Sequence, residues 1–285
     1  MRIVRIIFSA AVVGAAASAG LVTAPAAPAA DAVAAVDATA VTAAVVNATA
    51  VNYVALGDSY SSGLGAGDYL SSSGSCDRSA DAYPEQWAGA NSPASFVSVA
   101  CSGATTADVL ASQVSALSAS TTLVSITIGG NDAGFSNVME TCVFSSTSTC
   151  VNAVKTAEAF VADQLPARLD STLQTIAADA PNAKVVVLGY PDLYDLSKSG
   201  SCIGLSTQDR VALNQGADDL DNALQAAAQA NQDTFADVRG QFAGHEICDS
   251  GSWLHSVDIF AISSSYHPTA AGQELGYLPV FGRDA

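Results

Sequence analysis

Residues 53–63 read YVALGDSYSSG, a short apolar run followed by glycine and polar residues. Other short apolar runs followed by polar residues occur further along the chain. The apolar run from Tyr53 to Leu56 is of the short kind that forms a buried strand, and Gly57 ends it. Asp58 and Ser59 follow at once. Because glycine lets the chain turn sharply, the sequence predicts Ser59 at the carboxyl end of the strand.

Short apolar runs alternate with longer helical patterns along the remainder of the chain. Further strands are predicted at residues 96–100, 123–128, 184–188 and 234–238. Helices are predicted at residues 81–90, 106–117, 151–178 and 208–232, the last with Thr207 as its N-cap. This alternation predicts an α/β fold with a mostly parallel sheet of five strands and helices on both faces. Ligands bind at the carboxyl ends of the strands in such sheets.

Residues capable of chemistry follow several of these strands. Asn131 lies in a Gly-Gly-Asn-Asp stretch after the third strand, and its amide is suited to donating a hydrogen bond to an oxyanion. Gly103, after the second strand, offers a backbone N–H with no side chain in the way. A nucleophilic serine also needs a base, since its hydroxyl is a weak nucleophile. The chain has three histidines, namely His245, His255 and His267.

The N-terminal residues have the features of an export signal. Arg2 and Arg5 precede an apolar run, and small residues follow. We therefore predict a signal peptide at residues 1–29, with cleavage as early as residue 19 as an alternative. Residues 30–50 are predicted to form a low-complexity, Ala-rich arm, and residues 51–285 the folded domain. A membrane anchor is disfavoured because the apolar run is too short to span a bilayer comfortably.

Composition agrees with a secreted globular protein. The formal net charge of −17 disfavours nucleic acid as a partner, because phosphate backbones would be repelled. Six cysteines without a C-x-x-C pair favour three disulfides over a zinc ribbon or thiol redox chemistry. Sequence alone leaves their connectivity open. Sequential pairing, which keeps every loop local, gives Cys76–Cys101, Cys142–Cys150 and Cys202–Cys248.

Taken together, the chain resembles the SGNH (GDSL) hydrolases. Residues 53–63 resemble the first block of the family, Gly103 the second, residues 129–132 the third and His267-Pro268 the last. The blocks occur in family order and span nearly the whole predicted domain. With its leader and cysteines, the chain is similar to the secreted actinobacterial lipases, esterases and phospholipases. The resemblance implies a three-layer α/β/α sandwich with a flavodoxin-like sheet.

The resemblance also implies a role for each matching residue. Ser59 would be the nucleophile and His267 the general base. The oxyanion hole would consist of the backbone N–H groups of Ser59 and Gly103 and the side chain of Asn131. In many members an Asp stands three residues before the histidine, but here that residue is Ser264. We therefore predict a Ser–His dyad in which the main-chain oxygen of Ser264 orients His267. Asp258, nine residues upstream of His267, is too far in sequence for the usual local turn.

The leading hypothesis is a secreted carboxylic ester hydrolase acting on lipid esters, either triglyceride or phospholipid. A carbohydrate acetyl esterase on the same fold and a catalytically silent secreted binding module are the alternatives. We expect a monomer that needs no cofactor and no metal and makes at most transient contact with lipid surfaces. Residues 63–67 read GLGAG, which lacks the G-x-G-x-x-G spacing of a dinucleotide-binding loop and is instead interpreted as a flexible loop lining the substrate groove.

Overall fold

Five parallel strands form the central sheet of the protein in a computed structural model, which describes residues 50–198, 202, 204–258 and 262–285. The predicted leader and all but the last residue of the predicted arm lie outside the described residues. The order across the sheet is β2-β1-β3-β4-β5. The strands are β1 (Asn52–Gly57), β2 (Ser95–Ser98), β3 (Leu123–Thr127), β4 (Lys184–Leu188) and β5 (Thr234–Ala236).

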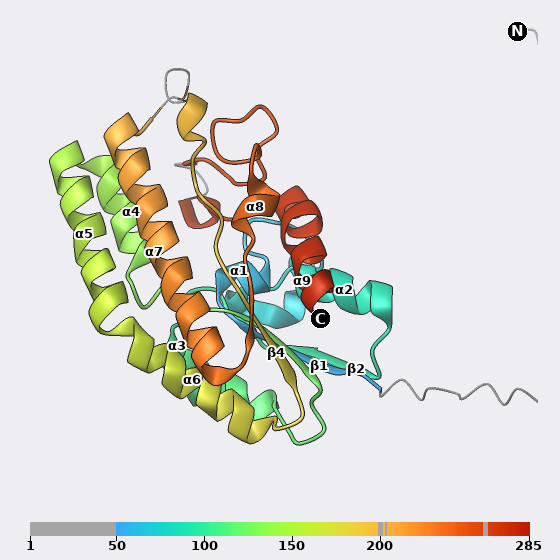
Figure 1. The fold of residues 1–285 in the computed structure, drawn as a ribbon. Coiled ribbons are helices and arrows are strands. Elements are labelled where there is room, and N and C mark those ends of the chain that lie inside the picture. The colour runs from blue at the N-terminus through green and yellow to red at the C-terminus, as the bar shows by residue number, and fades with distance from the viewer. Residues whose placement is uncertain (1–49, 199–201, 203, 259–261) are drawn as a thin grey trace, which may run out of the picture. The chain divides into compact units, whose positions relative to one another are not determined.

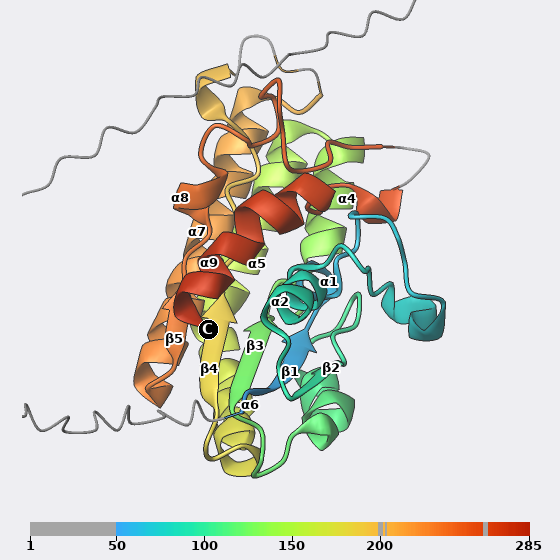
Figure 2. The same cartoon turned by 90° about the vertical axis from the view of Figure 1, so that its right-hand side faces the viewer.

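The predicted α/β fold is confirmed: helices cover both faces of the sheet. Helix α2 (Tyr83–Asn91) and helix α9 (Leu278–Asp284) lie on one face. Helix α6 (Leu165–Asp179) and helix α7 (Thr207–Asn231) lie on the other, with α5 (Thr147–Asp163) and α4 (Phe135–Phe144) packed outside or beside them (Figures 1 and 2). The central strands β1, β3 and β4 are buried along nearly their whole length, as a sheet covered on both faces requires.

The long helical stretch predicted at residues 151–178 is two helices rather than one. Helix α5 ends at Asp163 and α6 begins at Leu165, and Gln164 between them is non-helical. Pro166 causes the break, because it cannot donate a backbone hydrogen bond and suits only the first turn of a helix. The N-cap of α7 is Ser206 rather than Thr207, since the Ser206 hydroxyl accepts the hydrogen bond from the Asp209 N–H.

The helix predicted at residues 106–117 is irregular. It begins as α3 (Thr106–Asp108), continues as a π-helical turn (Val109–Gln113) and ends as a 3-10 turn (Val114–Ala116). The Gln113 amide explains part of this geometry. It accepts a hydrogen bond from the Gly57 N–H at 2.7 Å and donates one to the Gly57 carbonyl at 2.9 Å. The π-turn thereby holds Gly57, the last residue of β1, two residues before Ser59.

Three disulfides join the cysteines in the sequential order. They are Cys76–Cys101, Cys142–Cys150 and Cys202–Cys248. The first attaches the segment before Gly103 to a short 3-10 helix (Ser71–Cys76), and the second joins α4 to α5. Among the described residues, no helix is long and apolar enough to cross a membrane.

Candidate active site

Ser59 is the first residue of the short helix α1 (Ser59–Ser62), which is separated from the end of β1 by Asp58 alone. Gly57 makes the turn with φ near +123°, and a Cβ there would lie 2.5 Å from the Thr127 carbonyl oxygen. Only glycine fits such a position. The end of β1 therefore points α1, and Ser59 with it, to the carboxyl edge of the sheet, as the sequence predicts.

Asp58 caps α1 and organises the turn. One of its carboxylate oxygens accepts hydrogen bonds from the Tyr60 N–H at 3.0 Å and the Thr127 hydroxyl at 2.7 Å. The other accepts from the hydroxyl of Tyr190. Burial raises the pKa of Asp58 to about 6, even though these hydrogen bonds oppose the rise. Asp58 is thus an N-cap that positions Ser59.

Ser59 and His267 lie 208 residues apart in sequence and are hydrogen-bonded in the structure. The Nε2 atom of His267 is 2.8 Å from the Ser59 hydroxyl oxygen. Both side chains are buried, at 6% and 8% exposure. This is the distance at which an imidazole can take the proton of a serine hydroxyl.

The other ring nitrogen of His267 faces a main-chain oxygen. Its Nδ1 atom lies 3.0 Å from the carbonyl of Ser265. Because a carbonyl can only accept, Nδ1 carries the hydrogen and Nε2 presents its lone pair to Ser59. The carbonyl hydrogen-bonded to Nδ1 is therefore that of Ser265, one residue after the predicted Ser264, and the Ser264 carbonyl lies close enough to act on the ring as well. The Ser264 carbonyl accepts from the main-chain N–H of His267 at 3.2 Å, because the chain turns tightly before the histidine.

The His267 ring is held neutral by its surroundings. Burial lowers the pKa of His267 to about 4. The main-chain oxygens of Ser265 and Ser264 oppose this fall, and the nearby His255 adds to it. A neutral imidazole is the form that can accept a proton. At neutral pH the ring is therefore in the state that a general base requires.

Two tyrosines connect the helix that carries Ser59 to the loop that carries His267. The Tyr60 hydroxyl donates to the main-chain oxygen of Tyr266 at 2.7 Å. Tyr266 itself has φ near +66°, an unusual conformation for a bulky residue. Its hydroxyl is 2.9 Å from that of Tyr194, which helps to hold it there. Tyr60 and Tyr266 are not predicted as site residues from the sequence, although each is the direct neighbour of a predicted catalytic residue.

The predicted oxyanion donors come from three different loops. The Ser59 N–H lies in the first turn of α1, where no intrahelical acceptor exists. The Asn131 side chain donates one N–H to the Ala104 carbonyl at 3.0 Å, which leaves its second N–H for another acceptor. Gly103 stands between Cys101, whose N–H donates to the Gly57 carbonyl at 2.9 Å, and Ala104. Its loop is thus attached both to the end of β1 and to Asn131.

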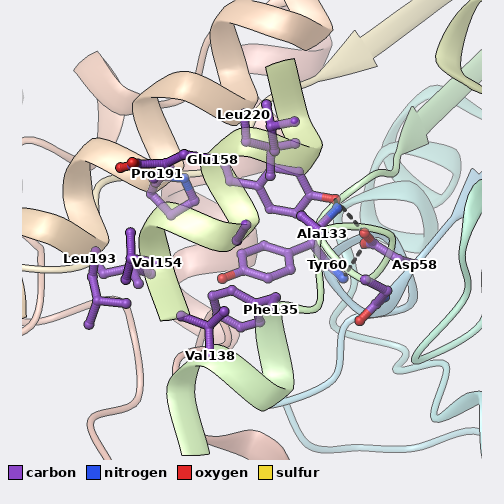
Figure 3. A pocket seen from close by; sticks show the side chains of 18 of the residues that line it. Asp58, Tyr60, Ala133, Phe135, Val138, Val154, Glu158, Pro191, Leu193 and Leu220 are labelled. Atoms are coloured by element: carbon purple, nitrogen blue, oxygen red, sulfur yellow. Dashed lines mark hydrogen bonds between the residues drawn. The ribbon is translucent and has the colours of Figure 1, made fainter. Parts of the chain in front are cut away.

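An apolar pocket opens beside Ser59 and Asn131. It holds about 730 Å³ of space, including its open mouth. Figure 3 shows that apolar side chains from several helices face the pocket, with Asp58 and Glu158 on opposite sides of it. The apolar lining comes mainly from Phe135 and Val138 of α4, Val154 and Val161 of α5, and Leu213 and Leu220 of α7. We call this cavity the inner pocket.

The remaining histidines support the structure around the site. His255 contacts the Gly65 carbonyl through Nε2 at 2.8 Å, and its main-chain N–H donates to the His267 carbonyl at 3.0 Å. A Cβ at Gly65 would lie 3.0 Å from the Cβ of His267, so this glycine permits close packing behind the histidine. The loop at residues 63–67 is thus placed against His267, and its residues are not among those that line the inner pocket. His245 stacks on Trp253 with ring centroids 3.7 Å apart.

Within the part of the chain that the structure describes, no group of three or more His, Cys, Asp or Glu side chains is arranged to hold a metal ion.

The parallel sheet, the covering helices and the buried Ser–His pair define a three-layer serine hydrolase fold. A model of the GDSL-like lipase/acylhydrolase family matches residues 55–275, and the chain belongs to this family. It is 55% identical over 233 residues to lipase 1 of Streptomyces coelicolor, covering 82% of this chain and 86% of that protein.

Two solved structures are also similar to this chain. A phospholipase A1 from Streptomyces albidoflavus superposes with a TM-score of 0.81 at 55% identity, covering 83% of this chain and all of that one. An extracellular lipase from Streptomyces rimosus gives 0.80 at 50% identity, again over 83% of this chain and all of the other. The family makes this protein a carboxylic ester hydrolase.

Proposed function

We propose that this protein is a secreted lipase or phospholipase A that uses Ser59 as nucleophile and His267 as general base. The observation that carries the proposal is the 2.8 Å contact between Ser59 Oγ and His267 Nε2 at the edge of the inner pocket. The names of the relatives support a lipid ester as substrate.

The reaction begins when Ser59 Oγ attacks the ester carbonyl carbon and its proton passes to His267 Nε2. The tetrahedral intermediate carries a negative oxygen, which accepts hydrogen bonds from the Ser59 and Gly103 N–H groups and the Asn131 amide. Collapse of the intermediate breaks the bond to the alcohol oxygen, which takes the proton from Nε2. Water then attacks the acyl-enzyme by the same route and releases the carboxylic acid and free Ser59.

The imidazolium that forms in each step is oriented by a neutral group. Its Nδ1–H donates to the Ser265 carbonyl, 3.0 Å away. A carbonyl carries only a partial charge, so it stabilises the imidazolium less than a carboxylate would. We therefore assign a Ser59–His267 dyad in which the Ser265 main-chain oxygen fixes the tautomer.

The inner pocket suits the acyl chain of the substrate. It contains Ser59 and the proposed oxyanion donor Asn131, so an acyl group bound to Ser59 would extend into it. Its lining is mainly apolar, which favours an acyl chain of several carbons. The apolar lining of the inner pocket therefore favours a lipid esterase over a carbohydrate acetyl esterase.

Secretion is supported by independent features of the chain. The N-terminal residues have the pattern of a signal peptide, although they lie outside the described residues. The three disulfides are typical of an oxidising compartment. The similar lipase from Streptomyces rimosus is extracellular.

The proposal is tested by the acyl-length profile of hydrolysis. The wild-type enzyme should hydrolyse p-nitrophenyl esters of medium or long acyl chains faster than the acetate. Gly216 of α7 lines the inner pocket, and a Cβ there would contact Val154 at 3.4 Å, so Gly216→Val should shift the optimum to shorter chains. Ala226→Val, on an exposed position of the same helix, should leave the profile unchanged. A wild-type optimum at acetate would contradict the proposal.

A further inference from the structure

A second cavity lies on the other side of α4 and reaches His267 instead of Ser59. One wall is α4, through Met139, Val143 and Phe144, and the other is the segment at residues 262–267. The cavity holds about 1020 Å³ of space, including its open mouth. We call it the outer groove. Phe135, at the start of α4, lines both cavities.

Helix α4 separates the two cavities because different faces of it line each one. Ser136, Met139, Glu140 and Val143 follow the spacing of one helical face and line the outer groove. Val138 lies on a different face and lines the inner pocket. The Cys142–Cys150 disulfide joins α4 to α5 and fixes this dividing wall.

The reaction itself assigns a different part of the ester to each cavity. His267 must give its proton to the oxygen of the departing alcohol, so the alcohol must lie on the His267 side of the scissile bond. The acyl carbon stays attached to Ser59. His267 lines the outer groove but not the inner pocket, whereas Ser59 and Asn131 line the inner pocket but not the outer groove.

We propose that the outer groove binds the alcohol portion of the ester and selects alcohols that carry an apolar chain of their own. This inference rests on the proposed function, because it uses His267 as the proton donor. The rim of the groove supports the preference for apolar alcohols. Phe144 is 66% exposed and Ile262 is 52% exposed, and both line the groove on opposite walls. A hydrocarbon chain of the alcohol that passed between Phe144 and Ile262 would cover both exposed side chains.

The outer groove, as far as the structure describes it, has few charged side chains, whereas a site for a small ionic alcohol would need charged partners. Glu140 is the one charged side chain among the described residues that line it, and it lies on the exposed side of α4. The other side chains on the α4 wall are mainly apolar, namely Phe135, Met139, Val143 and Phe144. The structure therefore favours a substrate with apolar chains on both sides of the reacting ester.

The inference is tested by the transfer of a common acyl group to two alcohols. The enzyme is acylated with p-nitrophenyl butyrate in a mixture that contains both ethanol and 1-hexanol. The oxygen of each alcohol attacks the butyryl carbon while its proton passes to His267 Nε2. The bond from that carbon to Ser59 Oγ then breaks, and Oγ takes the proton from Nε2. The ratio of hexyl to ethyl butyrate, per mole of alcohol, then reports only on the alcohol side, because both products come from one acyl-enzyme.

We expect the wild-type enzyme to favour hexanol. The double variant Phe144→Ser/Ile262→Ser should lower the hexyl-to-ethyl ratio about tenfold, because it removes apolar contacts of the alcohol chain. Val143→Trp, which narrows the groove, should lower it as well. Val211→Ser removes a 48% exposed apolar side chain from α7, outside both cavities, and should leave the ratio unchanged. Gly216→Val should change the acyl-length profile but not the ratio.

The inference fails if the ratio is the same in the wild type and in the double variant, or if Val211→Ser lowers it equally. It also fails if Gly216→Val moves the ratio and the outer-groove variants do not, since the alcohol would then lie in the inner pocket. Failure of the proposed function looks different. In that case the wild type would release no p-nitrophenol, or Ser59→Ala would release it at the wild-type rate.

Discussion

The Nδ1 atom of His267 lies 3.0 Å from the main-chain oxygen of Ser265. In a Ser-His-Asp triad, a carboxylate occupies this place. The difference matters because a carbonyl belongs to the backbone and persists whatever side chain stands at that residue. It also makes the orientation of His267 dependent on the local turn, which the Ser264 carbonyl and the unusual φ of Tyr266 help to form.

This arrangement predicts that no single acidic side chain is essential to His267. Neutralising the Asp of a protease triad lowers turnover by about 10⁴. Asp258→Asn should cost less than about tenfold here, because the Ser265 carbonyl, which the variant keeps, is the hydrogen-bond partner of His267 Nδ1. Ser264→Ala should be nearly silent. The measurement is kcat/KM on a p-nitrophenyl ester, and a thousandfold loss in a folded Asp258→Asn variant would restore a triad.

The acid limb of the activity profile should lie well below that of an ordinary histidine. Burial lowers the pKa of His267 from 6.5 to about 4, so the ring stays neutral to more acidic pH. We expect kcat/KM to fall only as the pH drops toward 4. Asp58, with a pKa raised to about 6 by burial, is the group most able to interfere, because it caps the helix of Ser59. An acid limb between pH 6 and 7 that persists in Asp58→Asn would contradict the assignment.

The same pKa shift predicts a pH dependence of stability. The unfolded chain takes up a proton on His267 below about pH 6.5, whereas the folded protein does so only near pH 4. The unfolded state therefore binds more protons in this window, and the free energy of unfolding should fall as the pH falls. Between pH 8 and pH 5 the loss from His267 is about 2 kcal/mol.

The contribution of His267 to the free energy of unfolding can be separated from that of the carboxyl groups by comparing the wild type with His267→Gln. Burial raises the pKa values of Asp58, Asp192 and Asp233 to about 6, and these groups act in the opposite direction. Urea unfolding of the wild type and His267→Gln at both pH values gives the difference. Equal pH dependence in the two proteins would mean that His267 titrates normally when folded.

Asn131 should act on turnover rather than on substrate binding. Its amide is held by the Ala104 carbonyl at 3.0 Å, so its second N–H is already oriented before the substrate arrives. The charge that it would stabilise appears only in the transition state. Asn131→Ala should lower kcat by about 10²–10³ with little change in KM. An effect confined to KM would indicate that Asn131 binds the substrate in its ground state.

The fold could be predicted from the sequence where the local pattern decides the structure. Buried parallel strands appear as short apolar runs, and β4, at Lys184–Leu188, was predicted to the residue. The first residue of α7 does not follow from residue types alone, because Ser206 and Thr207 are both good N-caps and only the contact with Asp209 distinguishes them. Helix α4 was not predicted, since its apolar residues face two cavities and give no single stripe.

The candidate site was predictable only where the residues lie in recognisable motifs. Ser59, Asn131 and His267 follow from the motifs, and the structure brings Ser59 and His267 into contact and places Asn131 beside the same pocket as Ser59. The contact from Tyr60 to the Tyr266 carbonyl spans 206 residues and has no local signal. The choice between the Ser264 and Ser265 carbonyls depends on the turn before His267, which residue types alone do not determine.

Covalent labelling of the native enzyme with a fluorophosphonate tests the central claim most directly, because only an activated serine reacts readily with such a probe. Intact-mass analysis should find one adduct per molecule, peptide mapping should place it on Ser59, and Ser59→Ala should remain unlabelled. His267→Gln should label far more slowly while staying folded. A folded wild-type protein that resists the probe, or an adduct that persists in Ser59→Ala, would contradict the assignment of Ser59 and His267 as the catalytic pair.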